Sequence, residues 1–180
     1  MSEGPTMVAR VPVVVVTGPV GVGKTTVASA VGDELERRGM AHTVLDVDWL
    51  AHTWPAPADD PFNSRLVYRN LADVCRNAIE AGAGRIVLAY VIEDWDGRDA
   101  IAACIPGADL TVVRLTVEPA TNAARLRGRE SPESLAWYLA RAPELERIMS
   151  ANGVGDHVVT TDGWTPAEVA SEVLRVTGWD

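Results

Sequence analysis

The sequence is poor in cysteine and has no apolar segment that could anchor it in a membrane. It contains only two cysteines, Cys75 and Cys104, so a disulfide framework is excluded. Both thiols lie in apolar, helix-like contexts, and we expect them to be buried or half-buried. The apolar run at residues 11–16 is too short to span a bilayer, and no signal-peptide pattern is present. These absences predict a cytoplasmic protein without a membrane partner.

Positive charge is also scarce. The chain has 16 Lys and Arg residues against 25 Asp and Glu residues, which gives a formal net charge of −9. Sequence-independent binding of nucleic acid requires a basic surface, so nucleic acid is not the expected partner. A local basic pocket for phosphate groups is compatible with this balance.

Lysine itself is nearly absent, because Lys24 is the only one and every other basic side chain is arginine. Lys24 lies in the motif Gly18-Pro19-Val20-Gly21-Val22-Gly23-Lys24-Thr25, which follows an apolar run and opens a helical pattern. This is the spacing of a phosphate-binding P-loop, in which backbone N–H groups and the lysine hold the phosphates of a nucleotide and the threonine hydroxyl binds Mg²⁺. We expect residues 18–26, Thr26 included, to contact the nucleotide. The rival dinucleotide pattern fails, because Thr26 stands where its third glycine is required.

Strand-like and helix-like segments alternate along the rest of the chain. The predicted strands cover residues 11–17, 43–47, 85–92, 110–117 and 157–161, and the predicted helices cover residues 24–38, 65–81, 95–104, 119–127, 131–150 and 166–176. Ser64 is the expected cap of the second helix. Such alternation predicts an α/β protein with a parallel, doubly wound sheet. We expect one domain over residues 1–180, with residues 1–10 as a loose leader.

Two aspartates end the second predicted strand, where ligands of parallel sheets bind. Asp46 and Asp48 are two residues apart, so both are expected on one face. A carboxylate there can support Mg²⁺, or it can accept the proton of an acceptor hydroxyl; a turn or capping role is the alternative. Glu93 and Asp94 follow the third predicted strand and are further candidates for the metal, or acids at the start of a helix.

Together with an arginine cluster near residue 127, these motifs resemble the P-loop small-molecule kinases. That group includes adenylylsulfate kinase, shikimate kinase and chloramphenicol phosphotransferase, and it shares the nucleoside monophosphate kinase-like fold. The resemblance implies a three-layer sandwich whose five-stranded parallel sheet has the order 2-3-1-4-5, with an arginine-bearing lid at about residues 125–133. Adenylylsulfate kinases typically carry glycine between the two aspartates. Val47 stands there in this chain, which disfavours adenylylsulfate as the acceptor.

The resemblance also implies roles for individual residues. Arg125 and Arg129 are expected to stabilise the transferred phosphoryl group from the lid, with Arg125 also contacting the nucleotide, unless the cluster is a solvated helix end. Asp48 is expected to contact the acceptor or act as the base. Arg141 matches a second arginine directed at the active site, and an ion pair on the helix surface is its alternative. Residues 160–163 are expected near the adenine.

The acceptor side is the least specified. Trp49 and Trp54 fall in a proline-rich segment, and Arg65 begins the next helix. Trp49 could form an aromatic wall for a ring-bearing or hydrophobic acceptor, although ordinary packing under a loop is the favoured explanation. Arg65 could bind an anionic acceptor, and a solvated helix face explains it equally well.

The sequence therefore predicts an ATP- and Mg²⁺-dependent phosphotransferase acting on a hydroxyl of a small molecule, as a monomer or homodimer. Catalysis is assigned to Lys24, Asp48, Arg125 and Arg129, and the metal to Thr25 and Asp46. A nucleoside or nucleotide kinase and a nucleotide-gated regulatory ATPase are the alternatives. ATP is preferred over GTP because no guanine-recognition signature is present.

Overall fold

The computed structural model describes residues 10–180, so nearly all of the expected leader, residues 1–9, lies outside the described residues. Its centre is a five-stranded sheet in which every pairing is parallel and the strand order is β2-β3-β1-β4-β5. The strands are β1 (Val11–Thr17), β2 (Thr43–Asp46), β3 (Ile86–Ala89), β4 (Ala108–Thr116) and β5 (His157–Thr160). The predicted fold class and strand order are confirmed.

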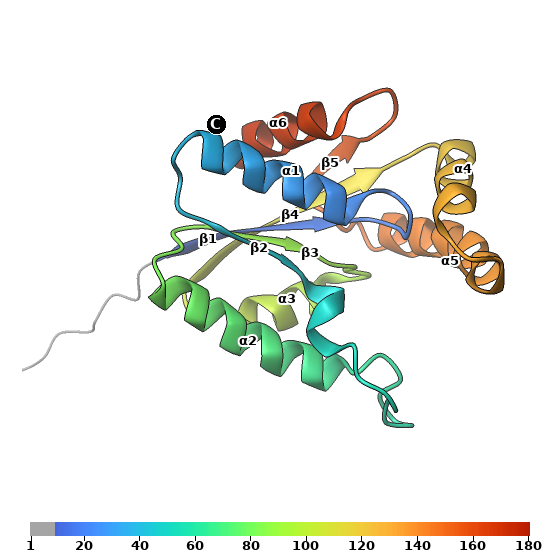
Figure 1. The fold of residues 1–180 in the computed structure, drawn as a ribbon, viewed down its shortest axis with the longest axis horizontal. Coiled ribbons are helices and arrows are strands. Elements are labelled where there is room, and N and C mark those ends of the chain that lie inside the picture. Colours follow the sequence, from blue (N-terminus) through green and yellow to red (C-terminus); the bar gives the residue numbers. More distant parts are fainter. Residues whose placement is uncertain (1–9) are drawn as a thin grey trace, which may run out of the picture.

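Helices cover both faces of this sheet (Figure 1). They are α1 (Lys24–Arg37), α2 (Ser64–Glu80), α3 (Trp95–Cys104), α4 (Pro119–Arg129), α5 (Pro132–Ala151) and α6 (Pro166–Thr177). Side chains alternate between the faces of a strand, so Val14 and Val16 of β1 pack with α1 and α6, whereas Val13 and Val15 pack with α2 and α3. All four valines are fully buried, which explains their uninterrupted apolar run.

The pair α4 and α5 lies beyond the carboxyl ends of the strands, at the right of Figure 1. Only Glu130 and Ser131 separate the two helices, so the segment at residues 125–133 is mostly helical rather than a loop. Leu145 and Met149 anchor the second half of α5 in the core beneath the sheet.

The elements differ from the prediction mainly where strands end. The third strand stops at Ala89, so Tyr90 already lies past the sheet, and residues Val47–Ala51 form a short 3-10 helix, η1. The expected capping role of Ser64 is wrong. The cap residue is Asn63, in a left-handed conformation with φ of 52°, and the Asp60 carboxylate accepts the free N–H group of Ser64 at 2.8 Å.

The two cysteines are free, with Cys75 buried and Cys104 half-buried, as predicted. Burial raises the pKa of the Cys75 thiol to about 11, so it stays protonated at neutral pH. Among residues 10–180, no helix has the length and apolar character needed to cross a membrane.

Candidate active site

The P-loop connects β1 to the first turn of α1, and its glycines are required by their surroundings. Gly18 has φ of 142°, and a Cβ atom there would lie 2.6 Å from the Leu115 carbonyl oxygen. Gly21 has φ of 86°, and a Cβ atom there would lie 2.3 Å from Asn122 Oδ1 on α4. Side chains are therefore excluded on the protein side of the loop, and the backbone can approach a ligand on the other side.

Lys24 is the first residue of α1, and its ammonium group turns back over the loop. Its Nζ donates to the carbonyl oxygens of Gly18 at 3.1 Å and Pro19 at 3.3 Å. Burial lowers the pKa of Lys24 to about 8, although the nearby carboxylates of Asp48 and Asp46 act in the opposite direction. The side chain is thus mostly charged at pH 7, and a phosphate group would offer it a stronger acceptor than two carbonyls.

The two residues predicted to support Mg²⁺ are in direct contact. Thr25 Oγ1 donates to Asp46 Oδ2 at 2.6 Å, and Asp46 Oδ1 accepts the N–H group of Asp48 at 3.1 Å, which fixes the carboxylate at the start of η1. A hydroxyl beside a carboxylate is an oxygen donor set suited to Mg²⁺, which commonly takes few protein ligands and keeps several waters. Among residues 10–180, no group of three or more His, Cys, Asp or Glu side chains is arranged to hold a metal ion.

The other candidate metal carboxylates have different partners. Asp94 caps α3, with Oδ1 accepting the N–H group of Gly97 at 2.8 Å. Glu93 accepts a hydrogen bond from Arg141. Neither contact involves Thr25, so the geometry favours Asp46 over both.

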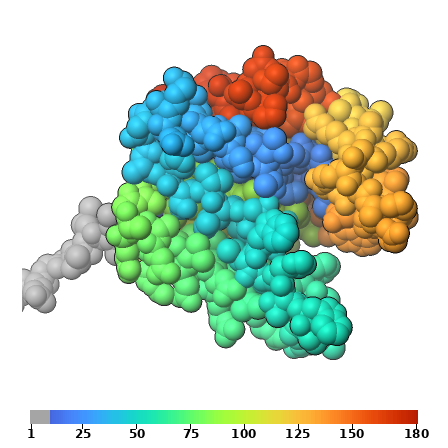
Figure 2. All heavy atoms as spheres, in the orientation of Figure 1, coloured from blue at the N-terminus to red at the C-terminus, as the bar shows by residue number. Residues whose placement is uncertain are grey.

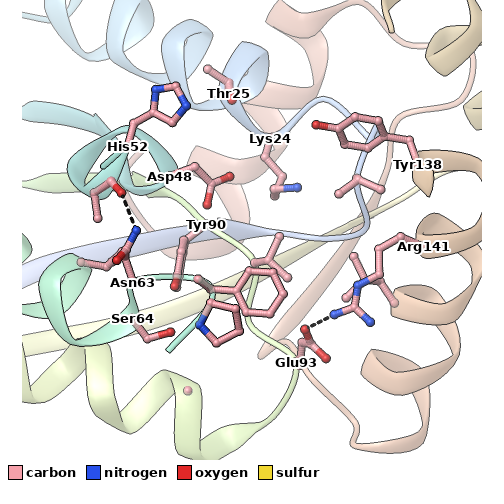
Figure 3. A pocket seen from close by; sticks show the side chains of 18 of the residues that line it. Lys24, Thr25, Asp48, His52, Asn63, Ser64, Tyr90, Glu93, Tyr138 and Arg141 are labelled. Atoms are coloured by element: carbon pink, nitrogen blue, oxygen red, sulfur yellow. Dashed lines mark hydrogen bonds and ion pairs between the residues drawn. The ribbon is translucent and has the colours of Figure 1, made fainter. Parts of the chain in front are cut away.

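A cavity of about 840 Å³ opens in front of the P-loop. One end, which we call the P-loop half, is lined by Gly21, Gly23, Lys24, Thr25 and Thr26. A second part of the lining, which we call the aromatic half, consists of Trp54, Phe62, Tyr68, Tyr90, Trp137 and Tyr138 together with Glu93, Asp94 and Arg141. Tyr138 lies where the two halves meet, beside Lys24 in Figure 3. In Figure 2 the segment around residues 47–63, in cyan and teal, and helices α4 and α5, in yellow and orange, project beyond the body of the molecule.

Asp48 lies between these halves, with its side chain directed toward Lys24 (Figure 3). Burial raises the pKa of its carboxyl group, the positive charge of Lys24 lowers it, and the neighbouring Asp46 raises it again. A carboxylate with a raised pKa is a better proton acceptor than an exposed one. The position and the chemistry both suit a group that takes a proton from a hydroxyl.

The three predicted arginines occupy different places. Arg129 lines the cavity and is close enough to Lys24 for its charge to lower the lysine pKa, while its side chain also pairs with Glu130 at 2.6 Å. Arg125 does not line the cavity; it donates to the Val22 carbonyl at 3.1 Å and to Thr161 Oγ1 at 2.9 Å. Arg125 therefore joins α4 to the P-loop and to the segment that follows β5.

Arg141 lines the aromatic half, on the far side of the cavity from the P-loop helix. It binds the Glu93 carboxylate (Figure 3). It also donates to Glu144 Oε2 at 2.9 Å. Both of the roles considered for Arg141 from the sequence are therefore combined, because it is an ion-pair partner that also faces the cavity.

The structure does not bring Trp49 and Arg65 to the cavity. Trp49 is 72% exposed and packs edge-to-face on His52, with ring centroids 5.5 Å apart. Arg65 forms a two-pronged ion pair with Asp59, with N–O distances of 3.0 and 3.1 Å. Neither side chain is among the lining residues.

Several lining residues escaped the sequence analysis, most clearly Tyr90, Tyr68 and Tyr138. The sequence analysis placed Tyr90 inside the third strand, but β3 ends at Ala89. Because ligands bind just beyond the carboxyl ends of parallel strands, a strand end at Ala89 would have marked Tyr90 as a candidate site residue. Burial, with smaller effects from Tyr68 and Asp48, raises the pKa of its phenol, which therefore stays protonated and able to donate a hydrogen bond. Tyr138 lies on α5 and carries no such local signal.

Comparison with known proteins agrees with this architecture. A family model described as an AAA domain matches residues 14–148. A search of curated proteins finds no significant match to the sequence.

Solved structures with the same fold include three of particular relevance. The tunicamycin resistance protein of Deinococcus radiodurans superposes with a TM-score of 0.68 at 18% identity, covering 94% of this chain and 96% of that one. The adenylylsulfate (APS) kinase of Mycobacterium tuberculosis, solved with AMPPNP and APS, gives 0.62 at 26% identity, covering 94% and 98%. A gluconokinase of Sinorhizobium meliloti gives 0.61 at 23% identity, covering 95% and 94%.

The family match spans the P-loop, the aspartates after β2 and both arginine-bearing helices. The chain therefore belongs to the AAA-domain family of P-loop proteins, and its fold is that of the P-loop small-molecule kinases.

Proposed function

We propose that the protein is an ATP-dependent phosphotransferase that moves the γ-phosphoryl group to a hydroxyl of a small molecule. The observation that carries this proposal is the position of Asp48, which lines one cavity together with Lys24 and lies between the P-loop half and the aromatic half. A protein that only binds or hydrolyses a nucleotide has no need of a second, aromatic half. The likeness to an APS kinase solved with an ATP analogue supports the same conclusion.

The residues of the P-loop half would bind the donor. Lys24 and the loop N–H groups would hold the β- and γ-phosphates, and Thr25 and Asp46 would hold Mg²⁺ directly or through its waters. Arg125 would support the nucleoside end through Thr161. When bound, MgATP supplies the phosphoryl group and the positive charge of the metal.

Asp48 and Arg129 would act during transfer. The acceptor oxygen bonds to the γ-phosphorus, the bond from that phosphorus to the departing ADP oxygen breaks, and the hydroxyl proton passes to the Asp48 carboxylate. Arg129 would place its guanidinium beside the transferred group, where a planar fork matches phosphate oxygens. Burial of Asp48 favours its protonated form, which assists the proton transfer.

A nucleoside kinase is the second candidate, because the cavity-lining rings of Trp54, Trp137 and Tyr138 offer faces on which a base could stack. A regulatory ATPase is the third, and it differs by needing no acceptor.

An acceptor screen with labelled ATP separates these functions. A phosphotransferase forms ADP and a labelled product only when an acceptor is present, and Lys24→Ala abolishes both. Labelling of nucleosides alone would identify the second candidate. Hydrolysis that no small molecule accelerates would overturn the proposal in favour of the third.

A further inference from the structure

The walls of the aromatic half are unusually exposed for large apolar side chains. Trp54 is 92% exposed, Phe62 75% and Trp137 53%, and all three line the cavity. Trp54 and Phe62 come from the segment between η1 and α2, whereas Trp137 comes from α5, so the rings approach the cavity from two separate elements. Exposed rings that border a concave pocket gain free energy when an apolar ligand covers them.

The floor of this half is formed by uncharged side chains. Tyr68 and Tyr90 line it, and burial raises the pKa of both phenols, which therefore remain uncharged. They offer hydroxyl groups and ring surface but no charge that could pair with an ionised ligand.

Among the described residues, two arginines border the aromatic half, and both are paired with carboxylates. Arg141 binds Glu93 and Glu144, and Arg129, whose guanidinium carbon lies 6.0 Å from the Tyr138 ring centre, pairs with Glu130 at 2.6 Å. Arg65, the residue that could have met an anion, pairs with Asp59 outside the cavity.

Carboxylates, in contrast, are plentiful. Asp48, Glu93 and Asp94 all line the cavity. A carboxylate or phosphate on the acceptor would lie close to these three negative groups. To pair with Arg141, it would have to displace Glu93 or Glu144. Like charges brought together in this way disfavour binding of the ligand.

We propose that the acceptor is an alcohol without negative charge, either neutral or cationic, that carries an apolar or aromatic ring. This inference rests on the proposed phosphotransferase function and narrows it. It separates this chain from kinases whose acceptors are anions, such as the APS bound in the similar structure.

Three probes with the same ring and the same hydroxyl test the charge preference. They are phenylglycol, which is neutral, phenylethanolamine, which is cationic, and mandelate, which is anionic. Each is titrated calorimetrically into the full-length protein saturated with AMPPNP and Mg²⁺. We expect both non-anionic probes to bind at least tenfold more tightly than mandelate. Equal or tighter binding of mandelate, or no binding of any probe at its solubility limit, overturns the inference.

A charge variant tests the cause. Glu93→Gln removes one of the two carboxylates on Arg141, so mandelate should bind several-fold more tightly and phenylethanolamine more weakly than to the wild type. Glu144→Gln removes the other carboxylate from the same arginine and should shift the probe affinities in the same direction. Glu172→Gln is the control, because Glu172 pairs with Arg175 away from the cavity lining; it should leave the probe affinities unchanged. If Glu93→Gln is folded by its thermal melt and leaves the ratio of mandelate affinity to phenylethanolamine affinity unchanged, the charge explanation is wrong.

A ring variant tests the apolar wall. Trp137→Ala should weaken phenylglycol binding roughly tenfold, as expected for the loss of a stacked ring and its buried area, and Trp137→Phe should restore most of it. Unchanged binding in Trp137→Ala would remove the ring from the inference. The AMPPNP titration keeps the two proposals apart: failure of AMPPNP to bind the wild type contradicts the proposed function, whereas AMPPNP binding with a preference for mandelate contradicts only this inference.

Discussion

The P-loop half and the aromatic half of the cavity are built in different ways. The P-loop half is made of backbone and of residues at the junction of β1 and α1, held in place by fully buried valines and by close contacts at Gly18 and Gly21. The aromatic half is made of side chains, several of them exposed, that come from the segment before α2, from the end of β3 and from α5. The first half can hold one kind of ligand, a phosphate chain, whereas the second can change its ligand by exchanging side chains on an unchanged scaffold.

The two halves of the cavity also differ in their charged side chains. Lys24 is surrounded by the charged groups of Asp46, Asp48 and Arg129. This combination of positive and negative charges suits a polyanion that binds together with a metal ion. In the aromatic half, Arg141 is neutralised by acids. Variants that affect one half and leave the other intact should therefore separate donor binding from acceptor chemistry.

The largest effect is expected at the boundary between the halves. Asp48→Asn removes the proposed proton acceptor and should lower the single-turnover transfer rate by on the order of 10²- to 10⁴-fold. AMPPNP affinity, measured by calorimetry, should change little, because the Lys24 contacts to the loop remain. A wild-type transfer rate would exclude Asp48 as the base and would weaken the division into halves.

Arg129 tests whether α4 contributes to chemistry or only to binding. Arg129→Ala should lower the transfer rate by on the order of 10²- to 10³-fold, the range found when one donor to a developing charge is removed. Arg127→Ala, a neighbouring arginine of α4 outside the cavity lining, is the control and should retain the wild-type rate. Similar losses in both variants would indicate a general effect of helix charge.

The metal contact should respond only when Mg²⁺ is present. Asp46→Asn weakens the oxygen donor set shared with Thr25, and we expect ATP affinity in Mg²⁺ to fall roughly 10- to 100-fold. After chelation with EDTA, variant and wild type should bind ATP equally. A loss of the same size without Mg²⁺ would mean that Asp46 supports the fold of the loop instead.

Arg125 should matter for stability more than for transfer. Its hydrogen bonds join α4 to Val22 of the P-loop and to Thr161. Arg125→Ala should cost about 1 kcal/mol of folding free energy, which corresponds to a fall in melting temperature of about 2–4 °C for a domain of this size. Scanning fluorimetry measures this directly, and an unchanged melting temperature would contradict the proposed link between α4 and the loop.

The smallest effect compares two exposed tryptophans. Trp54 lines the cavity and Trp49 does not, so Trp54→Ala should weaken phenylglycol binding several-fold while Trp49→Ala leaves it unchanged. Both should change the folding free energy by less than about 0.5 kcal/mol, because neither side chain is buried. Weaker phenylglycol binding by Trp49→Ala would mean that Trp49 contacts the acceptor, as the sequence suggested, although it does not line the cavity in the structure.

Much of the P-loop half was predictable because its signals are local. A strand, a glycine-rich turn and the first turn of a helix occupy consecutive residues. At fixed positions in this motif, the glycines let the backbone approach the phosphates and Lys24 supplies a positive charge. The alternation of strands and helices then leaves few topologies, since parallel strands need right-handed crossovers. The aspartates after β2 follow from the same logic, because ligands collect beyond the carboxyl ends of the strands.

The sequence by itself thus determined the nucleotide loop, the fold class and the placement of Asp46 and Asp48 at the end of β2. Only the tertiary structure decided which side chains form the aromatic half. Glu93 and Arg141 are 48 residues apart in the chain and become an ion pair only because α5 folds back over the end of β3. Arg65 pairs with Asp59 and does not reach the cavity, because the irregular segment before α2 places Asp59 beside it. Side chains on a loop and on a distant helix meet through packing, and no spacing along the chain encodes that meeting.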